Sequence, residues 1–256
     1  MTIIKPKPTA LITGFSSGIG LAYAKYLASK DWDLHLVSHD ESRAEIGLKA
    51  LNYSNTNVYL YDLSKPESIK ELSKSIPTPN LIVANAGITK YGEAGTLSSN
   101  EKLDLFYLLC NGVIDLIESY LPEMKKQNSA RIVIISSIGA ITPMPKSSIY
   151  AAAKSAVHSY GESLSKELKD RNISVTVSLP GYVRTKAHKR AGLDHLIKKV
   201  PSWMWIEADQ VVKETEKASL KGKSNIIPGL VYKLVRPFLK MSLANSLWNR
   251  ITRRRT

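Results

Sequence analysis

The stretch TALITGFSSGIG, residues 9–20, decides the fold that this sequence predicts. An apolar run ends at Thr13, three glycines follow at positions 14, 18 and 20, and an amphipathic helical pattern begins at Leu21. Glycine lets a backbone pass close to a phosphate group, and the start of a helix offers unpaired N–H groups and a positive dipole end. We therefore expect a strand, a phosphate-binding turn and a helix, with a plain strand-to-helix turn as the alternative.

The same alternation of strand and helix continues along the chain. Apolar runs at residues 33–38, 57–63, 80–84, 131–136, 174–179 and 226–227 are the expected further strands. One helical pattern ends at Leu51, and the next begins with Ser64 as its N-cap, shortly before Pro66. Two longer helical patterns span about 99–126 and 148–170. Continuously apolar strands that alternate with helices indicate an α/β fold, with a parallel sheet covered by helices on both faces.

Composition narrows the class of protein further. The 256 residues are 43% apolar and 23% charged, which is typical of a globular chain. Cys110 is the only cysteine and the five histidines lack ligand spacing, so we expect no disulfide, no metal site and a cytoplasmic setting. The sequence contains no run of 18 uncharged apolar residues, so it predicts no membrane-spanning helix. A signal peptide cleaved near Ala22-Tyr23-Ala24 is disfavoured, because cleavage there would remove the glycine turn.

The formal net charge of +14 is concentrated at the C-terminal end. Nine basic residues and no acidic residue follow residue 220. Residues 231–251 mix apolar side chains with Lys and Arg. This pattern is typical of a basic helix that lies peripherally on an anionic membrane surface. The alternative is a helix that packs on the domain or on another subunit. We treat 231–256 as a C-terminal extension. Nucleic acid is not an expected partner, because no recognition motif accompanies the charge.

A second stretch, SSIGAITPMPKSSIYAAAK at residues 136–154, carries the chemistry. If its second half is helical, Tyr150 and Lys154 lie one turn apart on the same face, about 6 Å along the axis. Free tyrosine titrates near pH 10, so a phenolate at neutral pH needs a stabilisation of roughly 4 kcal/mol. An ammonium at about 4 Å in partly screened surroundings supplies about that much. The pair therefore predicts an acid and base.

The order of these motifs resembles the short-chain dehydrogenase/reductase family, in its compact branch of about 250 residues. The resemblance is close over residues 1–185 and looser beyond. It implies a doubly wound Rossmann-type sheet of about seven strands, a bound NAD or NADP, and hydride transfer between the nicotinamide and a carbonyl or alcohol. It also implies a single catalytic domain over residues 1–230, with a substrate lid at about 185–207, and a homo-oligomer, either a dimer or a tetramer.

The resemblance assigns roles to four groups of residues. In catalysis, Asn111 holds a water, Ser137 binds the substrate oxygen, Tyr150 is the acid or base and Lys154 binds the nicotinamide ribose. Ordinary alternatives stay open: Asn111 as a mid-helix polar residue, Ser137 as a turn cap and Tyr150 as a core aromatic. The implied cofactor-binding residues are Gly14, Ser16, Ser17, Gly18, Ile19 and Gly20 in the glycine turn; Asp62 and Leu63 by the adenine; Asn85, Ala86 and Gly87 along the channel; and Pro180, Gly181, Val183 and Thr185 by the carboxamide.

The end of the second strand bears on the choice between NAD and NADP. An acid there accepts from the ribose 2′-hydroxyl of NAD, whereas a basic residue meets the 2′-phosphate of NADP. By the resemblance, Ser38 takes the place of the NAD-selecting acid and His39 that of the NADP-selecting arginine. Asp40 can cap the next helix, and Arg43 is a second phosphate partner. We therefore expect NADP(H) to be favoured over NAD(H).

The substrate side is less constrained. Residues 185–207 contain Lys186, His188, Lys189, Arg190, Lys198 and Lys199, and then Trp203-Met204-Trp205. One interpretation is a solvated basic helix whose aromatic side chains pack it against the body of the domain. The other is an apolar substrate pocket with a cationic rim, which would bind a lipid-, acyl- or steroid-like carbonyl compound. The leading hypothesis is a carbonyl reductase or alcohol dehydrogenase. A cofactor-sensing or scaffold protein is one alternative, and a nucleotide-sugar epimerase or dehydratase is another, although little room follows Thr185 for the larger substrate domain of such enzymes.

Overall fold

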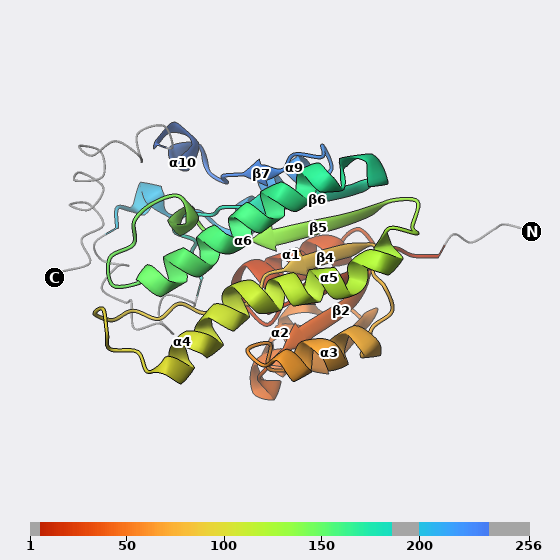
Figure 1. Ribbon diagram of the computed structural model, residues 1–256. Helices are drawn as coiled ribbons and strands as arrows, with labels where there is room; N and C mark the ends of the chain where they lie inside the picture. Colours follow the sequence, from red (N-terminus) through yellow and green to blue (C-terminus); the bar gives the residue numbers. More distant parts are fainter. Residues whose placement is uncertain (1–5, 186–199, 236–256) are drawn as a thin grey trace, which may run out of the picture.

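The strands form one parallel sheet at the centre of the computed structural model, which describes residues 6–185 and 200–235 (Figure 1). The strand order is β3-β2-β1-β4-β5-β6-β7. The strands are β1 (Thr9–Thr13), β2 (Asp33–Ser38), β3 (Thr56–Leu60), β4 (Leu81–Ala84), β5 (Ala130–Ile135), β6 (Ile173–Ser178) and β7 (Asn225–Ile226). The chain reverses its winding direction between β1 and β4, so a crevice opens at the carboxyl ends of these strands. The predicted seven-stranded, doubly wound fold is confirmed.

Helices cover both faces of the sheet, because the strands are apolar on both sides. Leu72, Leu109, Ile117 and Val157 form one core with the strands, and Tyr23, Leu27, Ala44 and Val212 form the core of the opposite face. Figure 1 shows α3, α5 and α6 on the near side of the sheet. The helices are α1 (Gly18–Ala28), α2 (Glu41–Leu51), α3 (Pro66–Ser75), α4 (Ser99–Phe106), α5 (Gly112–Met124), α6 (Ser148–Glu167), α9 (Ala208–Ser219) and α10 (Leu230–Val235). Short turns are η1 (Tyr107–Asn111), η2 (Ile138–Ala140), η3 (Lys169–Arg171) and η4 (Ser202–Met204).

The start of α3 differs from the prediction. Ser64 was expected to cap this helix, but its hydroxyl and its N–H both donate to Asp62 Oδ1, at 2.8 and 3.0 Å. The carboxylate of Asp62 thus closes a local turn that competes for Ser64. The N-cap is Lys65, and the helix begins at Pro66, whose missing N–H costs nothing at this position. The preceding strand also ends at Leu60, so Asp62 and Leu63 lie in the connecting turn.

The helix expected over residues 99–126 runs from Ser99 to Met124 with a π-helical turn, η1, in its middle. It begins with a capping box between Ser98 and Glu101. Among the described residues it is the one helix long and apolar enough to span a membrane by length and composition, but half of its apolar window is buried in the protein. Its buried apolar residues pack against the sheet, α3 and α6, as those of a core helix do.

Candidate active site

The glycine turn is packed so closely that side chains would not fit. Gly14 and Gly18 have φ values of +66° and +59°, which favour glycine. A Cβ on Gly14 would lie 2.8 Å from Ala86 Cα, and one on Gly20 would lie 2.3 Å from the carbonyl oxygen of Gly14. The turn therefore presents bare backbone, and α1 begins at Gly18 with no acidic residue in its first turn. This combination suits an anion at the helix N-terminus.

Thr13 and Asn85 join the glycine turn to the end of β4. Thr13 Oγ1 accepts hydrogen bonds from the N–H groups of Asn85 and Ala86, both at 2.9 Å. The amide of Asn85 donates in return to the carbonyl oxygens of Thr13 and Gly14, at 2.9 and 3.1 Å. Thr13 is not among the predicted site residues, although a threonine directly before the first glycine is a visible signal in the sequence. These bonds hold the two strand ends at the crevice in register.

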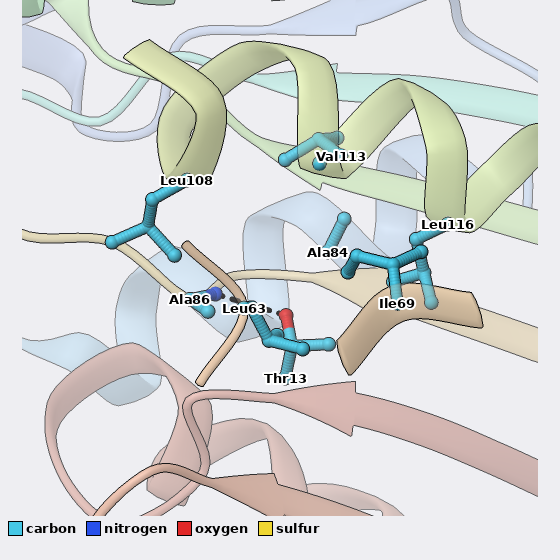
Figure 2. A pocket seen from close by; sticks show the side chains of 9 residues that line it. Thr13, Leu63, Ile69, Ala84, Ala86, Leu108, Val113 and Leu116 are labelled. Carbon is cyan, nitrogen blue, oxygen red and sulfur yellow. Dashed lines mark hydrogen bonds between the residues drawn. The ribbon is translucent and has the colours of Figure 1, made fainter. Parts of the chain in front are cut away.

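A narrow apolar pocket lies between these strand ends and α5 (Figure 2). Figure 2 shows the bond from the Ala86 N–H to Thr13, with Leu63 and Leu108 beside it. Its lining residues are Thr13, Leu63, Ile69, Ala84, Ala86, Leu108, Gly112, Val113 and Leu116. Leu63 and Ala86 thus line the same pocket, and their cofactor contacts stay a prediction. Asp62, next to Leu63, is exposed as a residue. Partial burial of its carboxyl group raises the pKa, but hydrogen bonds from Ser64 outweigh this and hold the pKa below its ordinary value.

The residues after β2 form a small basic cluster. Ser38 is buried and its hydroxyl donates to the carbonyl oxygen of Asp40 at 3.1 Å. Asp40 caps α2 by accepting from the N–H of Arg43, and the Arg43 guanidinium also contacts Asp40 Oδ2 and His39 Nε2, both at 2.9 Å. The side-chain and backbone hydrogen bonds from Arg43 hold the pKa of Asp40 well below its usual range. The prediction that Asp40 caps the helix is confirmed, and the cluster leaves the imidazole of His39 exposed at the surface.

Ser136 and Ser137 have different environments. Ser136 is buried, and its hydroxyl donates to the backbone carbonyl of Lys154 at 2.9 Å, which ties β5 to α6. Ser137 is half-buried; it caps η2 by accepting from the N–H of Gly139 at 3.1 Å. That bond uses one lone pair of the hydroxyl oxygen and leaves its O–H bond for another acceptor. The hydroxyl of Ser137 can therefore still donate to a bound ligand, whereas that of Ser136 is used within the fold.

Tyr150 and Lys154 lie one turn apart in α6, as predicted. Tyr150 is half-buried at the N-terminal end of the helix. The η2 turn that Ser137 begins packs on the same half of α6, because Ser155 donates to the carbonyl oxygen of Ala140 at 2.8 Å. Lys154 is 5% exposed, and its ammonium donates to the carbonyl oxygen of Ile135 at 2.8 Å. Burial lowers the pKa of Lys154 to about 8, so the protein holds a cation here against a desolvation cost.

The π-helical turn η1, which Asn111 ends, packs against α6, the helix that carries Tyr150 and Lys154. Asn111 ends the π-helical turn and is exposed, on the helix face that also carries exposed Asp115 and Glu118. Leu109, two positions earlier, points the other way and is fully buried. A Cβ added to Gly87 would lie 3.0 Å from Leu109 Cδ2 and 3.9 Å from Lys154 Nζ. Leu109 therefore lies beside Gly87, and the catalytic role of Asn111 stays a prediction.

The segment after β6 runs from the Ser137 turn to the glycine turn. The N–H of Ile138 donates to the carbonyl oxygen of Pro180 at 2.9 Å. At the other end, a Cβ on Gly18 would lie 3.1 Å from Thr185 Cγ2. Val183 is buried between these ends. The predicted carboxamide segment thus borders both halves of the site. Of the predicted lid, residues 186–199 lie outside the described part of the chain, as do residues 236–256 of the C-terminal extension.

A family model described as short chain dehydrogenase matches residues 8–195, which is most of the chain. The chain belongs to the short-chain dehydrogenase/reductase family. It is therefore an oxidoreductase of a family that binds NAD(P)(H) and acts on small molecules. The predicted family is confirmed.

Relatives of this short-chain dehydrogenase/reductase agree with that assignment. Carbonyl reductase family member 4 of Xenopus laevis is 30% identical over 207 residues, which cover 79% of this chain and 86% of the relative. The 3-oxoacyl-acyl-carrier-protein reductase of Haemophilus influenzae is 30% identical, with coverage of 80% and 87%. The solved structure of a short-chain dehydrogenase from Sphingobium yanoikuyae in complex with NADPH has a TM-score of 0.80 and 26% identity, covering 97% of this chain and 98% of that one.

The site of this short-chain dehydrogenase/reductase fits a nicotinamide dinucleotide. The three glycines form a cradle that a Cβ would fill, and the first turn of α1 holds no negative charge to repel a pyrophosphate. The basic cluster of His39 and Arg43 follows β2, where the ribose of a dinucleotide is recognised in this type of fold. The crevice between β1 and β4 therefore has the donors that such a cofactor needs.

Proposed function

We propose that the protein is an NADP(H)-dependent reductase or dehydrogenase that interconverts an apolar carbonyl compound and its alcohol, with Tyr150 as the acid and base. The observation that carries this proposal is the buried ammonium of Lys154, one turn from Tyr150 and beside the Ser137 turn. Within the described part of the chain no carboxylate pairs with Lys154, and a buried ammonium without a counter-ion is costly. Its place one turn from a phenol therefore supports a chemical role.

The chemistry assigned to each side chain follows from its position. The bound nicotinamide would supply or accept the hydride. In reduction, Tyr150 gives its phenolic proton to the carbonyl oxygen, and the O–H of Ser137 donates a hydrogen bond to the same oxygen. Lys154 favours the phenolate that remains, because its ammonium lies on the same helix face. In oxidation Tyr150 takes the proton back.

The proposed cofactor contacts are those of the residues already placed around the crevice. The backbone of Gly14 to Gly20 would hold the pyrophosphate, Leu63 and Ala86 would line the adenine side, and Val183 and Thr185 would meet the carboxamide. His39 and Arg43 would meet the 2′-phosphate. The guanidinium of Arg43 already pairs with Asp40, so Arg43 would contribute less to binding the 2′-phosphate than an unpaired arginine would.

The proposed apolar substrate is supported by a cluster near the end of the carboxamide segment. Val200 and Met204 are buried and pack with the aromatic rings of Tyr91, Tyr182 and Trp205. The Arg184 guanidinium lies 5.9 Å from the centre of the Trp205 ring, which adds a cation to this wall. A carbonyl carried on an apolar chain or ring suits such a wall better than a short polar substrate does.

Oxidation of NADPH and NADH against carbonyl compounds graded by chain length and ring size tests the proposal. We expect kcat/KM for NADPH to exceed that for NADH by about tenfold, and long-chain or ring ketones to be preferred to short polar ones. His39→Ala should reduce the ratio of kcat/KM for NADPH to kcat/KM for NADH, without changing the order of preference among the carbonyl compounds. Equal use of both cofactors would refute the proposed preference, and a flat substrate series would refute the apolar pocket.

A further inference from the structure

Tyr232 in α10 connects two segments at the site. Its ring is fully buried, and its hydroxyl accepts a hydrogen bond from the N–H of Tyr182 at 2.8 Å. The same hydroxyl donates to the carbonyl oxygen of Met204 at 2.5 Å. One phenol oxygen thus bridges the carboxamide segment and the aromatic substrate wall. Tyr232 belongs to the C-terminal extension, so the first residues of the extension pack on the domain.

The ring of Tyr232 also lies directly against the backbone of the carboxamide segment. A Cβ on Gly181 would lie 2.0 Å from Tyr232 Cζ, so only glycine permits this contact. The two bridged segments are paired with each other as well: Ile206 donates to the carbonyl of Tyr182, and Arg184 donates to that of Ile206, both at 2.9 Å. The pairing sets their relative register, and Tyr232 holds the pair against the body of the domain through the apolar cluster of Leu179, Val183 and Ile227.

The bridged segment is the one that faces the nicotinamide end of the proposed cofactor. It starts at Pro180, bonded to the Ser137 turn, and ends at Thr185 against Gly18. A displacement of the Tyr182 backbone would therefore move the groups near Val183 and Thr185 but leave the pyrophosphate cradle and the residues after β2 in place. We propose that Tyr232 is a positioning residue, which holds the carboxamide segment where it can bind the nicotinamide.

This inference rests on the proposed cofactor and is tested by equilibrium binding rather than by turnover. Tyr232→Phe keeps the ring against Gly181 but leaves the N–H of Tyr182 and the carbonyl of Met204 without their buried partner. We expect the variant to bind NADPH about tenfold more weakly. Its affinity for 2′-phospho-ADP-ribose, which lacks the nicotinamide, should stay within about twofold of the wild type, because the contacts of that fragment lie elsewhere.

Tyr120→Phe is the matched control. Tyr120 is also a buried tyrosine whose hydroxyl reaches two backbone carbonyls, those of Leu72 and Ile76, but it lies on α5, in the core between α3 and the sheet. It should lose stability without changing the affinity for either ligand. If Tyr232→Phe is poorly folded, Gly181→Ala provides a second route, because its Cβ must displace the ring; it should show the same nicotinamide-selective loss.

The pattern of the two affinities separates the outcomes. A loss confined to NADPH supports the inference. Equal losses for NADPH and the fragment, or no loss for either, overturn it, as does the same selective loss in Tyr120→Phe. A wild-type protein that binds neither ligand refutes the proposed function itself, and the inference falls with it.

Discussion

At the scale of single residues, the two neighbouring serines show how environment divides similar side chains. The hydroxyl of Ser136 is buried and holds the backbone of Lys154, whereas Ser137 is half-buried and uses only a lone pair in its turn. We expect Ser137→Ala to lower kcat by about 100-fold with little change in stability, because a donor to the reacting oxygen is lost. Ser136→Ala should instead cost about 1 kcal/mol of stability and change kcat far less. Steady-state kinetics and urea unfolding of both variants check this, and a larger loss of kcat in Ser136→Ala would reverse the assignment.

Lys154 leads to a prediction about stability and pH. Its pKa is lowered to about 8 by burial, from an ordinary value of 10.5, so at pH 7 the folded protein holds a disfavoured charge. Lys154→Met should abolish turnover and yet raise the free energy of unfolding of the cofactor-free protein at pH 7 by about 1 kcal/mol, after the lost bond to Ile135 is subtracted.

The sign of the pH dependence follows from linkage. Between pH 8 and pH 10.5 the unfolded chain binds a proton on Lys154 that the folded protein does not, so the stability of the wild type rises with pH relative to the variant. The advantage of Lys154→Met should therefore shrink over this interval. Urea unfolding at pH 7, 8, 9 and 10 measures it, and an advantage that grows with pH would contradict the assigned pKa shift.

At the scale of elements, the π-helical turn between α4 and α5 sets the environments of Leu109 and Asn111. It buries Leu109 beside Gly87 and leaves Asn111 exposed. We expect Asn111→Ala to lower kcat/KM by about tenfold or more, because this residue is proposed to hold a water of the proton relay. Ser137→Ala, measured beside it, shows the size of a genuine loss. A value within about twofold of the wild type would instead favour the alternative, an ordinary mid-helix polar residue.

The elements also show what the sequence could and could not predict. The strands and the glycine turn were predictable because a continuous apolar run and closely spaced glycines are local signals. Tyr150 and Lys154 share one helix at i and i+4, so their common face followed from the spacing alone. The orientation of Asn111 depends on a π turn that hydrophobic periodicity does not reveal. The start of α3 depends on whether Ser64 bonds to Asp62 or caps the helix, which the sequence pattern leaves open. The bond between Tyr232 and Tyr182 joins residues 50 positions apart, so no local pattern predicts it.

At the scale of the whole molecule, a buried ion pair joins the sheet to the helix that covers its second face. Arg131 in β5 contacts both carboxylate oxygens of Glu216 in α9 at 3.1 Å, and Tyr23 of α1 donates to the same carboxylate. Glu216→Ala removes the carboxylate that neutralises Arg131, so we expect a loss of about 3 kcal/mol in the free energy of unfolding. Glu123→Ala, which breaks an exposed pair with Lys126, should cost less than about 1 kcal/mol. Similar losses in the two variants would show that the buried pair has no special role.

The central claim is that Tyr150 is the acid and base of an NADP(H)-dependent reductase, and Tyr150→Phe tests it most directly. The variant removes only the phenolic oxygen. We predict that kcat for reduction of an apolar ketone falls by about 1,000-fold, while the dissociation constant of NADPH stays within about threefold of the wild type. Turnover that survives the substitution at a wild-type rate would contradict the account.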